Sequence, residues 1–537
     1  MSRKYDSHPT GLPRTRARRL RKTTVAISVA ALAIVTASCS STGSTPAGGA
    51  GGTAPAATQT LTYGLSSEPA AFRTGVNQGT AARVVLTLTQ RGLMVYDNAG
   101  KPVPALAKSY NVSDDGLTYT FTLRPDLTFS DGSALTSKNV KDTFNYLAKP
   151  ENGADAQQAF ANIASVATPS PNRVIIKLKN PLTAFLSILA DPESAIVPPP
   201  ALSGKPNTFG AGPFKIQTYN RGQNMVLVPY KGYFDAAAVK LQKIDLVFMS
   251  DEQARVKAIQ TGTVDMTAYI PDSSYATLEK DPNVNFLRTQ GIISYVIANL
   301  KNKPLSNKKV RQAISYAISR DDVNQANTFG NGVPISGIPI VSSSPYYSKQ
   351  DANPFGQDVA KAKQLMKEAG YASGFKLTIL TNSQYFGYQQ TAEVLKSELS
   401  KIGIDATIDT GDYATQIKKG NSAQYDLEVA ALGGITNDPY YLNAAFLGSP
   451  TYNRSAGINQ SLYSGLLQKA NQTPDGPDRE AIYKQIASVY NDDVPFFTMG
   501  QAAFAYALSP KLKGFKPLSG IIVYNSTYQL ATAYMAK

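Results

Sequence analysis

Short apolar runs alternate along most of the chain with stretches whose apolar residues recur at three- and four-residue spacing. Residues 375–380, 404–408 and 425–432 are runs rich in β-forming residues, which predict strands. Residues 358–370 and 391–402 carry one apolar face and are closed by glycines, which predicts amphipathic helices. Strands that alternate with helices in this way predict a mostly parallel sheet covered by helices.

The stretch 295–323 combines both patterns. Residues 295–300 predict a strand, a turn follows at 302–304, and Ser306 occupies a helix N-cap position. Beyond it, one apolar face of a helix that ends near Ser319 is formed by Val310, Ala313, Ile314, Ala317 and Ile318.

A hairpin and a capped helix are predicted in the first half of the chain. Asp115 and Gly116 form a hairpin turn, and apolar residues then alternate along 117–123 as one face of a strand. Thr136 can cap a helix whose inward residues are Val140, Phe144 and Leu147. At 537 residues the chain is too long for one core, so two or three domains are expected.

Two passages resemble a known family. Residues 104–146 contain the sequence pattern "P.LA.S…SDDG.TYTF.LR…F.DG..L...V", and residues 295–323 contain the pattern "N…PL.N..VRQAISYAI.R..V". Both resemble the peptide-class (family 5) extracellular solute-binding proteins of ABC importers, and the resemblance spans about 61–537. It implies an α/β, two-lobed periplasmic-binding-protein type II fold with a β-rich subdomain inserted in lobe one.

The resemblance implies the lobe boundaries, and the residues at the start of the chain indicate the two segments that precede them. The segments are a signal peptide at 1–38, a flexible tether at 39–60, lobe one at 61–290 with the inserted subdomain at about 96–205, lobe two at 291–510, and a C-terminal return to lobe one at 511–537.

The first residues are typical of an export signal. A basic region runs to Lys22, an apolar region covers 25–35, and small residues precede Cys39. The apolar region is too short for a permanent membrane span. Cys39, the only cysteine, lies where bacterial lipoprotein signals carry the lipid, although Thr36 stands where those signals usually have Leu. We expect a lipid on Cys39 and an extracytoplasmic protein anchored to the outer face of the cell membrane, with ordinary secretion as the alternative.

The residues between Cys39 and the first predicted strand are Gly, Ser, Thr, Ala and Pro without periodicity, which predicts a flexible tether. The net charge of the whole chain is +15, and the leader holds eight basic residues and one acid, which leaves +8 for the remainder. This positive excess is small and is not gathered in basic runs, which argues against nucleic-acid binding.

Catalysis by histidine is excluded after export, because His8 is the only histidine and lies in the leader. A single cysteine also excludes disulfides and cysteine-ligated metal sites. A hydrolase based on two carboxylates stays open, since their sequence spacing is not fixed. We expect a binding protein and not an enzyme, with no cofactor and no metal.

Ligands in such sheets lie beyond the carboxyl ends of strands, so residues 432–441 are expected to form a cleft wall. The expected ligand-binding residues are Ser67, Glu68, Tyr295, Asn299, Tyr413, Leu432, Gly433, Gly434, Ile435, Thr436, Asp438 and Tyr440.

The resemblance also bears on the solute. Peptide-binding relatives hold the free amino terminus with an aspartate four residues before the proline of a "D..[DE]P" motif, and Ile435 occupies that position here. Asp438 matches the second acid of the motif, for which a structural role is expected. Loss of a buried charge partner costs about 2–5 kcal/mol, so this cleft is not expected to favour an ammonium group. The expected solute is a peptide or peptide-like molecule with a blocked, cyclised or absent amino terminus.

Three alternatives stay open. Without Trp, an oligosaccharide would need Tyr413, Tyr440 or Tyr441 as a stacking surface. Another acid, such as Asp412 or Asp438, would hold an amino terminus if the matched position is shifted. A surface receptor with the same fold is the third. The expected partners are the solute, ABC permease subunits and the membrane, with the protein itself a monomer.

Overall fold

The computed structural model describes residues 58–69, 71–205, 207–383, 385, 387–447 and 457–537. The predicted signal peptide, Cys39 and nearly all of the predicted tether lie outside the described residues.

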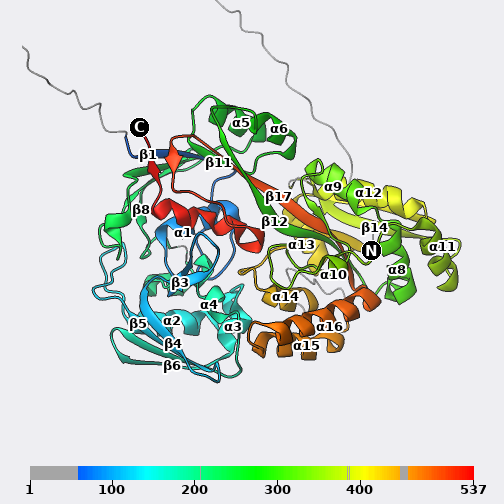
Figure 1. Ribbon diagram of the computed structural model, residues 1–537, viewed down its shortest axis with the longest axis horizontal. Helices are drawn as coiled ribbons and strands as arrows, with labels where there is room; N and C mark the ends of the chain where they lie inside the picture. Colours follow the sequence, from blue (N-terminus) through cyan, green and yellow to red (C-terminus); the bar gives the residue numbers. More distant parts are fainter. Residues whose placement is uncertain (1–57, 70, 206, 384, 386, 448–456) are drawn as a thin grey trace, which may run out of the picture. The chain divides into compact units, whose positions relative to one another are not determined.

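Two long antiparallel strands, β12 (Asn285–Ala298) and β17 (Phe496–Leu508), form the centre of the main sheet (Figure 1). The strand order is β15-β14-β16-β12-β17-β11-β1-β10-β9-β8. Different strands pair with the two ends of the long pair: β16 with β12 from Ile293 to Ala298, and β11 with β17 from Tyr506 to Leu508. We call the group that contains β1 lobe one and the group that contains β14 lobe two.

Lobe one is built around β1, which pairs in parallel with β10 and β11. Its Leu61, Tyr63 and Leu65 are buried against α1 and the C-terminal segment. The elements of this lobe are β1 (Thr60–Leu65), α1 (Thr80–Thr89), β8 (Phe214–Asn220), β9 (Asn224–Pro229), η4 (Ala236–Ala238), β10 (Lys243–Phe248), α5 (Glu252–Gln260), β11 (Met266–Ala268), η5 (Asp272–Ser274) and α6 (Tyr275–Leu278).

A subdomain inserted between α1 and β8 has its own sheet, ordered β4-β5-β7-β6. The predicted hairpin is confirmed: Gly116 has φ 67° and the Asp115 carboxylate accepts from the Leu117 N–H. Thr136 and Asn139 form the capping box of α2. The elements are β2 (Met94–Tyr96), β3 (Pro102–Pro104), β4 (Ala107–Val112), β5 (Thr118–Leu123), α2 (Ser137–Leu147), η1 (Pro150–Asn152), α3 (Gln157–Ala161), β6 (Ile163–Ser170), β7 (Arg173–Leu178), α4 (Phe185–Ile188), η2 (Pro192–Ser194) and η3 (Pro199–Ser203).

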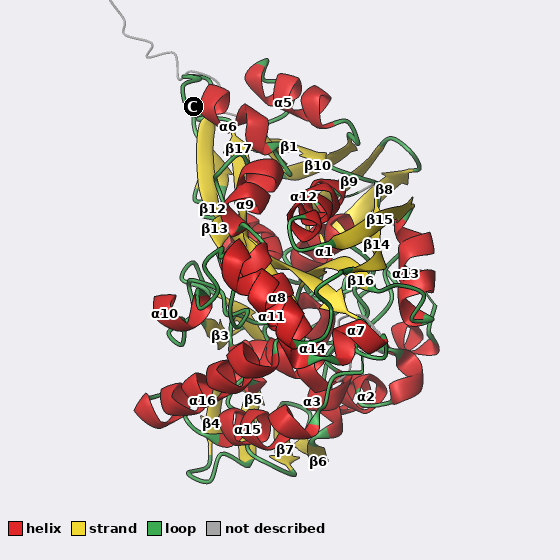
Figure 2. Cartoon of the chain, turned by 90° about the vertical axis from the view of Figure 1, so that its right-hand side faces the viewer, coloured by secondary structure: helices red, strands yellow, loops and turns green. Residues whose placement is uncertain are grey.

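Lobe two has parallel strands β14, β15 and β16, with a buried apolar cluster on each face. Its helices α15 and α16 lie beside the inserted subdomain in both views (Figures 1 and 2), where Thr183 donates to the Asn471 and Thr473 carbonyls. The elements are α7 (Lys303–Ser306), α8 (Lys308–Ala317), α9 (Arg320–Thr328), β13 (Val333–Pro334), α10 (Lys349–Ala352), α11 (Val359–Glu368), β14 (Phe375–Asn382), α12 (Tyr388–Ser400), β15 (Ile404–Gly411), α13 (Tyr413–Asn421), β16 (Leu427–Leu432), η6 (Pro439–Tyr441), α14 (Leu442–Leu447), α15 (Ser461–Gln472) and α16 (Pro477–Asp493).

The predicted N-cap at Ser306 is wrong by one residue. Ser306 ends the short helix α7, which carries Pro304 in its first turn, and its hydroxyl donates to the Lys303 carbonyl. Asn307 instead caps α8, accepting from the Lys309 N–H at 2.9 Å. The apolar face predicted for this helix is confirmed by the buried residues Val310, Ala313, Ile314 and Ala317.

The C-terminal segment joins all three parts through β18 (Leu512–Lys513), η7 (Gly520–Ala531) and β19 (Tyr534–Met535). Three successive side chains pack into three clusters: Ile521 into lobe two, Ile522 into the inserted subdomain and Val523 into lobe one. At Gly520, φ is 76° and a Cβ would lie 2.6 Å from the Asn437 side-chain oxygen, so the close approach there requires glycine.

Candidate ligand-binding site

The strands of the two lobes point their carboxyl ends towards each other along the long pair. The last residue of β11 pairs with Tyr506 of β17, which in turn pairs with Leu287 of β12. The last residue of β16 pairs with Ile293 of β12. These positions are six residues apart on β12, or about 20 Å at the usual rise of a strand. The pairing of β12 with β17 shifts register between Gln290 and Ile293, so the strand is irregular between the lobes. Ligands of α/β sheets bind beyond such strand ends, which makes this junction the candidate site.

Tyr269 directly follows β11 and forms the lobe-one wall. The buried Arg255 of α5 donates to the Tyr269 carbonyl at 2.8 Å, and the phenol hydrogen-bonds Thr80 at the start of α1. The ring lies edge-on to Phe504, with centroids 5.2 Å apart, and parallel to Tyr524 at 5.9 Å. Backbone and ring of Tyr269 are therefore both fixed.

A small hollow opens beside this tyrosine, and its walls are apolar or neutral. Its lining residues are Tyr63, Gly64, Leu65, Ser66, Thr80, Ala81, Val84, Ala268 and Tyr269. The hollow therefore lies at the carboxyl ends of both β1 and β11, where a ligand is expected.

Tyr385 follows the carboxyl end of β14 and forms part of the lobe-two wall. Its side chain is 50% exposed, and its ring lies edge-on to Tyr413, with centroids 4.9 Å apart. Burial raises the pKa of the Tyr524 phenol, and Tyr385 adds to that rise. Tyr385 therefore presents a half-exposed aromatic ring at the carboxyl edge of the lobe-two strands.

A series of buried hydrogen bonds holds this wall against the sheet. Asn382 donates to Gln416 at 2.6 Å, and Gln416 donates to the Glu428 carboxylate and the Val429 carbonyl. These hydrogen bonds fix α13, and with it Tyr413, over the sheet.

Ile435 contacts the inserted subdomain. Its carbonyl accepts from the Tyr96 hydroxyl at 3.0 Å, and its side chain packs against the apolar cluster of that subdomain, as does Tyr440. Thr436 is buried, and its hydroxyl accepts from the Asp438 N–H. Asn437 donates to the Ser519 carbonyl. This loop therefore ties lobe two to the inserted subdomain and to the C-terminal segment.

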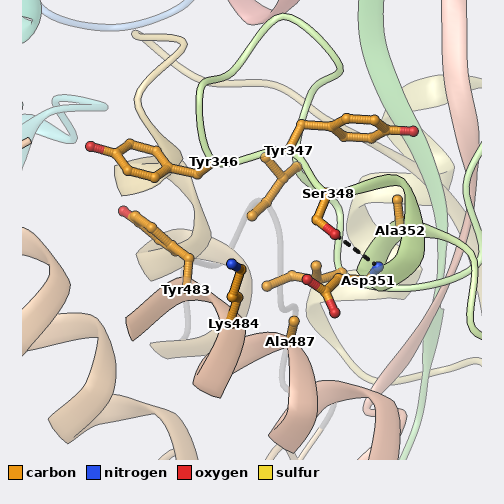
Figure 3. A pocket seen from close by; sticks show the side chains of 10 residues that line it. Tyr346, Tyr347, Ser348, Asp351, Ala352, Tyr483, Lys484 and Ala487 are labelled. Carbon is orange, nitrogen blue, oxygen red and sulfur yellow. Dashed lines mark hydrogen bonds between the residues drawn. The ribbon is translucent and has the colours of Figure 1, made fainter. Parts of the chain in front are cut away.

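Asp438 is held by a buried arginine. Arg479 of α16 donates to both carboxylate oxygens of Asp438, at 2.6 and 2.9 Å, and to Asp475. Figure 3 shows a hollow beside this network, where Tyr346 and Tyr483 lie side by side with Lys484 and Asp351 further along. Because Tyr346 donates to Asp475, this hollow borders a structural network and not the lobe junction.

Five of the predicted ligand residues are engaged in internal contacts. Tyr295 is 1% exposed and packs edge-on to Phe496, and Leu432 is fully buried in the same cluster. Asn299 donates to the Tyr425 carbonyl. Glu68 accepts from Tyr219 and Gly222 of the β8–β9 hairpin, and Asp438 is paired as described. These side chains are placed to stabilise the fold.

The other predicted residues lie nearer the junction. Ser67 is exposed just after β1, and Tyr413 begins α13 beside Tyr385. Gly433 follows β16. At Gly434, a Cβ would lie 3.0 Å from both Ile521 and Tyr441, so the chains approach closely there. Burial raises the pKa of Tyr440 to about 12, with Asp438 adding to the rise. A role of these residues in binding stays a prediction.

Sequence reasoning missed Thr80, Tyr269, Tyr385 and Tyr524. Tyr269 and Tyr385 each follow a strand, so the strand-end rule used for residues 432–441 would have found them. Tyr524 lies within η7 and gives no such signal.

Within the described ranges, no group of three or more His, Cys, Asp or Glu side chains is placed to hold a metal ion. In the same part of the chain, no helix combines the length and the apolar character needed to cross a bilayer.

Sequence comparison identifies relatives over most of the chain. The profile of the bacterial extracellular solute-binding proteins, family 5 (middle region), matches residues 101–454. The glutathione-binding protein GsiB of Salmonella typhi is 30% identical over 451 residues, which cover 81% of this chain and 88% of that protein. GsiB of Escherichia coli O157:H7 is 29% identical over the same shares.

Solved structures show the same architecture. AgaA of A. tumefaciens R10, in complex with agropinic acid, superimposes with a TM-score of 0.82 at 34% identity, covering 89% of this chain and 99% of that one. Helicobacter pylori DppA, in complex with the peptide STSA, gives 0.78 at 23% identity over 89% and 98%, which supports the fold. Members of the family act outside the cytoplasm, bind small solutes and deliver them to ABC permeases without converting them. The chain therefore belongs to the bacterial extracellular solute-binding proteins of family 5, with their two-lobed type II periplasmic-binding-protein fold, and is not an enzyme.

Proposed function

We propose that this chain captures a peptide or peptide-like solute whose amino terminus is blocked, cyclised or absent, and delivers it to an ABC import permease. The observation that carries the proposal is Ile435, at the position where peptide-binding relatives have an aspartate. Its carbonyl is bonded by Tyr96 and its side chain packs against an apolar cluster. An ammonium group would therefore find no carboxylate from this residue.

The two alternative acids already have partners. Asp412 caps α13, and its bonds to the side chain and backbone of Thr415 hold the pKa of this carboxyl below its usual value. Asp438 is bound by Arg479 through both oxygens. A solute amine at either acid would compete with these contacts, which favours a solute without a free amine.

Relatives with this fold differ in what they hold: GsiB is named for glutathione, and the AgaA and DppA structures contain agropinic acid and the peptide STSA. An oligosaccharide is a second candidate, supported by the tyrosines at the junction, Tyr269, Tyr385 and Tyr413. Tyr441 does not add to that surface, since it is 4% exposed and donates to the Pro339 carbonyl.

The solute that co-purifies with the protein should lack a reactive α-amine. Protein purified from the producing cells is denatured, and the released small molecules are analysed by mass spectrometry before and after treatment with an amine-specific reagent. A solute whose mass is unchanged by the reagent is expected. A stoichiometric peptide that is modified at its amino terminus would refute the proposal.

We place the mature protein, as a monomer, on the outer face of the membrane. A lipid on Cys39 holds it there, and the Gly-, Ser- and Ala-rich tether separates its folded part from the membrane. Labelled palmitate should be incorporated into the wild type and into Ser41→Ala. Cys39→Ala should lose the label and pass into the medium. Label retained in Cys39→Ala would contradict lipidation at this residue.

A further inference from the structure

The backbone of Tyr269 is strained. Its φ is 55°, in the left-handed region that residues with a side chain rarely adopt. Such strain persists only where the surroundings hold it, and here Arg255 binds the carbonyl while Thr80 binds the phenol. Glycine would relieve the strain but has no ring. The strained backbone and its two hydrogen bonds therefore hold an aromatic ring in this position.

The ring of Tyr269 is held on several sides and still lines open space. Phe504 packs edge-on, with an angle of 80° between the rings, and Tyr524 lies parallel to it at 7°. Tyr269 is only partly buried and borders the hollow at the ends of β1 and β11. The hollow itself has room for about one water, so a solute ring would lie over its mouth, against an aromatic surface already fixed in position.

One charged side chain contacts Tyr269: the guanidinium of Arg255, which is already bonded to the carbonyls of Met249, Ser250 and Tyr269. The residues that line the hollow are all neutral. Arg83, the charged neighbour of Tyr524, is already paired with Asp191 and Glu193 at 2.8 and 2.6 Å. A charged group in the hollow would lose hydration, and none of the side chains that line the hollow would supply a counter-ion.

We infer that Tyr269 of lobe one, together with Tyr385 at the carboxyl end of β14 in lobe two, holds an uncharged ring of the solute between the lobes. This inference rests on the proposed function and narrows it. Aromatic faces bind the C–H surface of such a ring, while the phenols and Ser66 offer hydrogen bonds to its polar groups. Two kinds of solute carry such an uncharged ring: a peptide with a cyclised amino terminus, such as a pyroglutamyl ring, and a sugar.

The test compares matched probes by titration calorimetry. They are Gln-Ala-Ala, N-acetyl-Gln-Ala-Ala, pyroglutamyl-Ala-Ala and maltose. We expect a ring probe to bind at least tenfold tighter than the acetylated open-chain peptide. Tyr269→Leu and Tyr385→Leu should each weaken the ring probe about tenfold and leave the acetylated peptide within twofold. Whichever ring probe responds identifies the source of the ring.

Three controls make the result decisive. Tyr534→Leu removes an exposed tyrosine of β19 and should change nothing. Tyr385 is half exposed, so its replacement tests the inference even if Tyr269→Leu folds poorly. Tyr269→Gly removes the ring and the backbone strain together, and should bind like Tyr269→Leu.

The inference is overturned if no ring probe binds, if ring and open-chain probes bind alike, or if the tyrosine variants weaken all probes equally. Tighter binding of Gln-Ala-Ala than of its acetylated form would instead refute the proposed function, whatever the tyrosine variants do.

Discussion

Replacing Arg479 with methionine should lower the free energy of unfolding by about 3–5 kcal/mol. The guanidinium is 0% exposed and joins α16 to the loop after β16 through Asp438. Its removal leaves the Asp438 carboxylate, which is 13% exposed, without a counter-ion. Breaking one side of a buried pair is costly because the remaining charge keeps its desolvation penalty.

The same change should weaken solute binding. The Asp438 carboxylate also accepts from the Tyr440 N–H and so begins η6, three residues after Ile435. Burial opposes the charge of Arg479, but Asp438 outweighs this effect and raises the pKa of the guanidinium, so Arg479 stays charged. In the variant, the stability deficit should shrink as the pH falls, since protonation neutralises the unpaired Asp438.

Urea denaturation of wild type and variants at pH 7.5 and pH 5 measures these effects. Lys484→Met is the matched control on the same helix, because the Lys484–Glu480 pair is largely exposed and contributes less than about 1 kcal/mol. Adding Asp438→Asn to Arg479→Met should restore part of the loss. An Arg479→Met protein within about 1 kcal/mol of wild type would show that this pair does not hold the loop.

Elements with one apolar face or a continuous apolar run could be predicted from the sequence, whereas the strands between the lobes could not. Helix α11 (Val359–Glu368) and strand β14 (Phe375–Asn382) lie where the patterns placed them. By contrast, the patterns predicted only residues 295–300 around β12, although β12 begins at Asn285, and they did not predict the far end of β17, which reaches Leu508. The additional residues include Arg288, Gln290, Gly291, Gly500 and Ala503, which are polar or small and give no apolar pattern.

The site was harder to predict than the fold, because a residue's spacing does not show which way its side chain points. Tyr295 belongs to a correctly predicted strand, but its ring faces the core. Glu68 follows β1 as expected, yet it turns to the β8–β9 hairpin, where Tyr219 and Gly222 bind it. Tyr524 reaches the junction only through the tertiary path of the C-terminal segment. These placements depend on contacts between distant parts of the chain.

Free and N-acetylated forms of one peptide should differ clearly in affinity for this protein. Relatives with an aspartate at the position of Ile435 gain a charge-assisted contact with the amino terminus. Such contacts are worth about 2–5 kcal/mol, which is more than tenfold in affinity. Here the free amine would lose its hydration without gaining a carboxylate from position 435, while an acetylated terminus would lose little, so the preference should be reversed.

Isothermal titration calorimetry with matched free and N-acetylated peptides therefore tests the central claim most directly. Arg479→Lys, which keeps a cation beside Asp438, serves as a check that the acid is not recruited by the solute. The account predicts that the acetylated peptide binds at least tenfold tighter than the free one, in both proteins. A clear preference of the wild type for the free amine would contradict it.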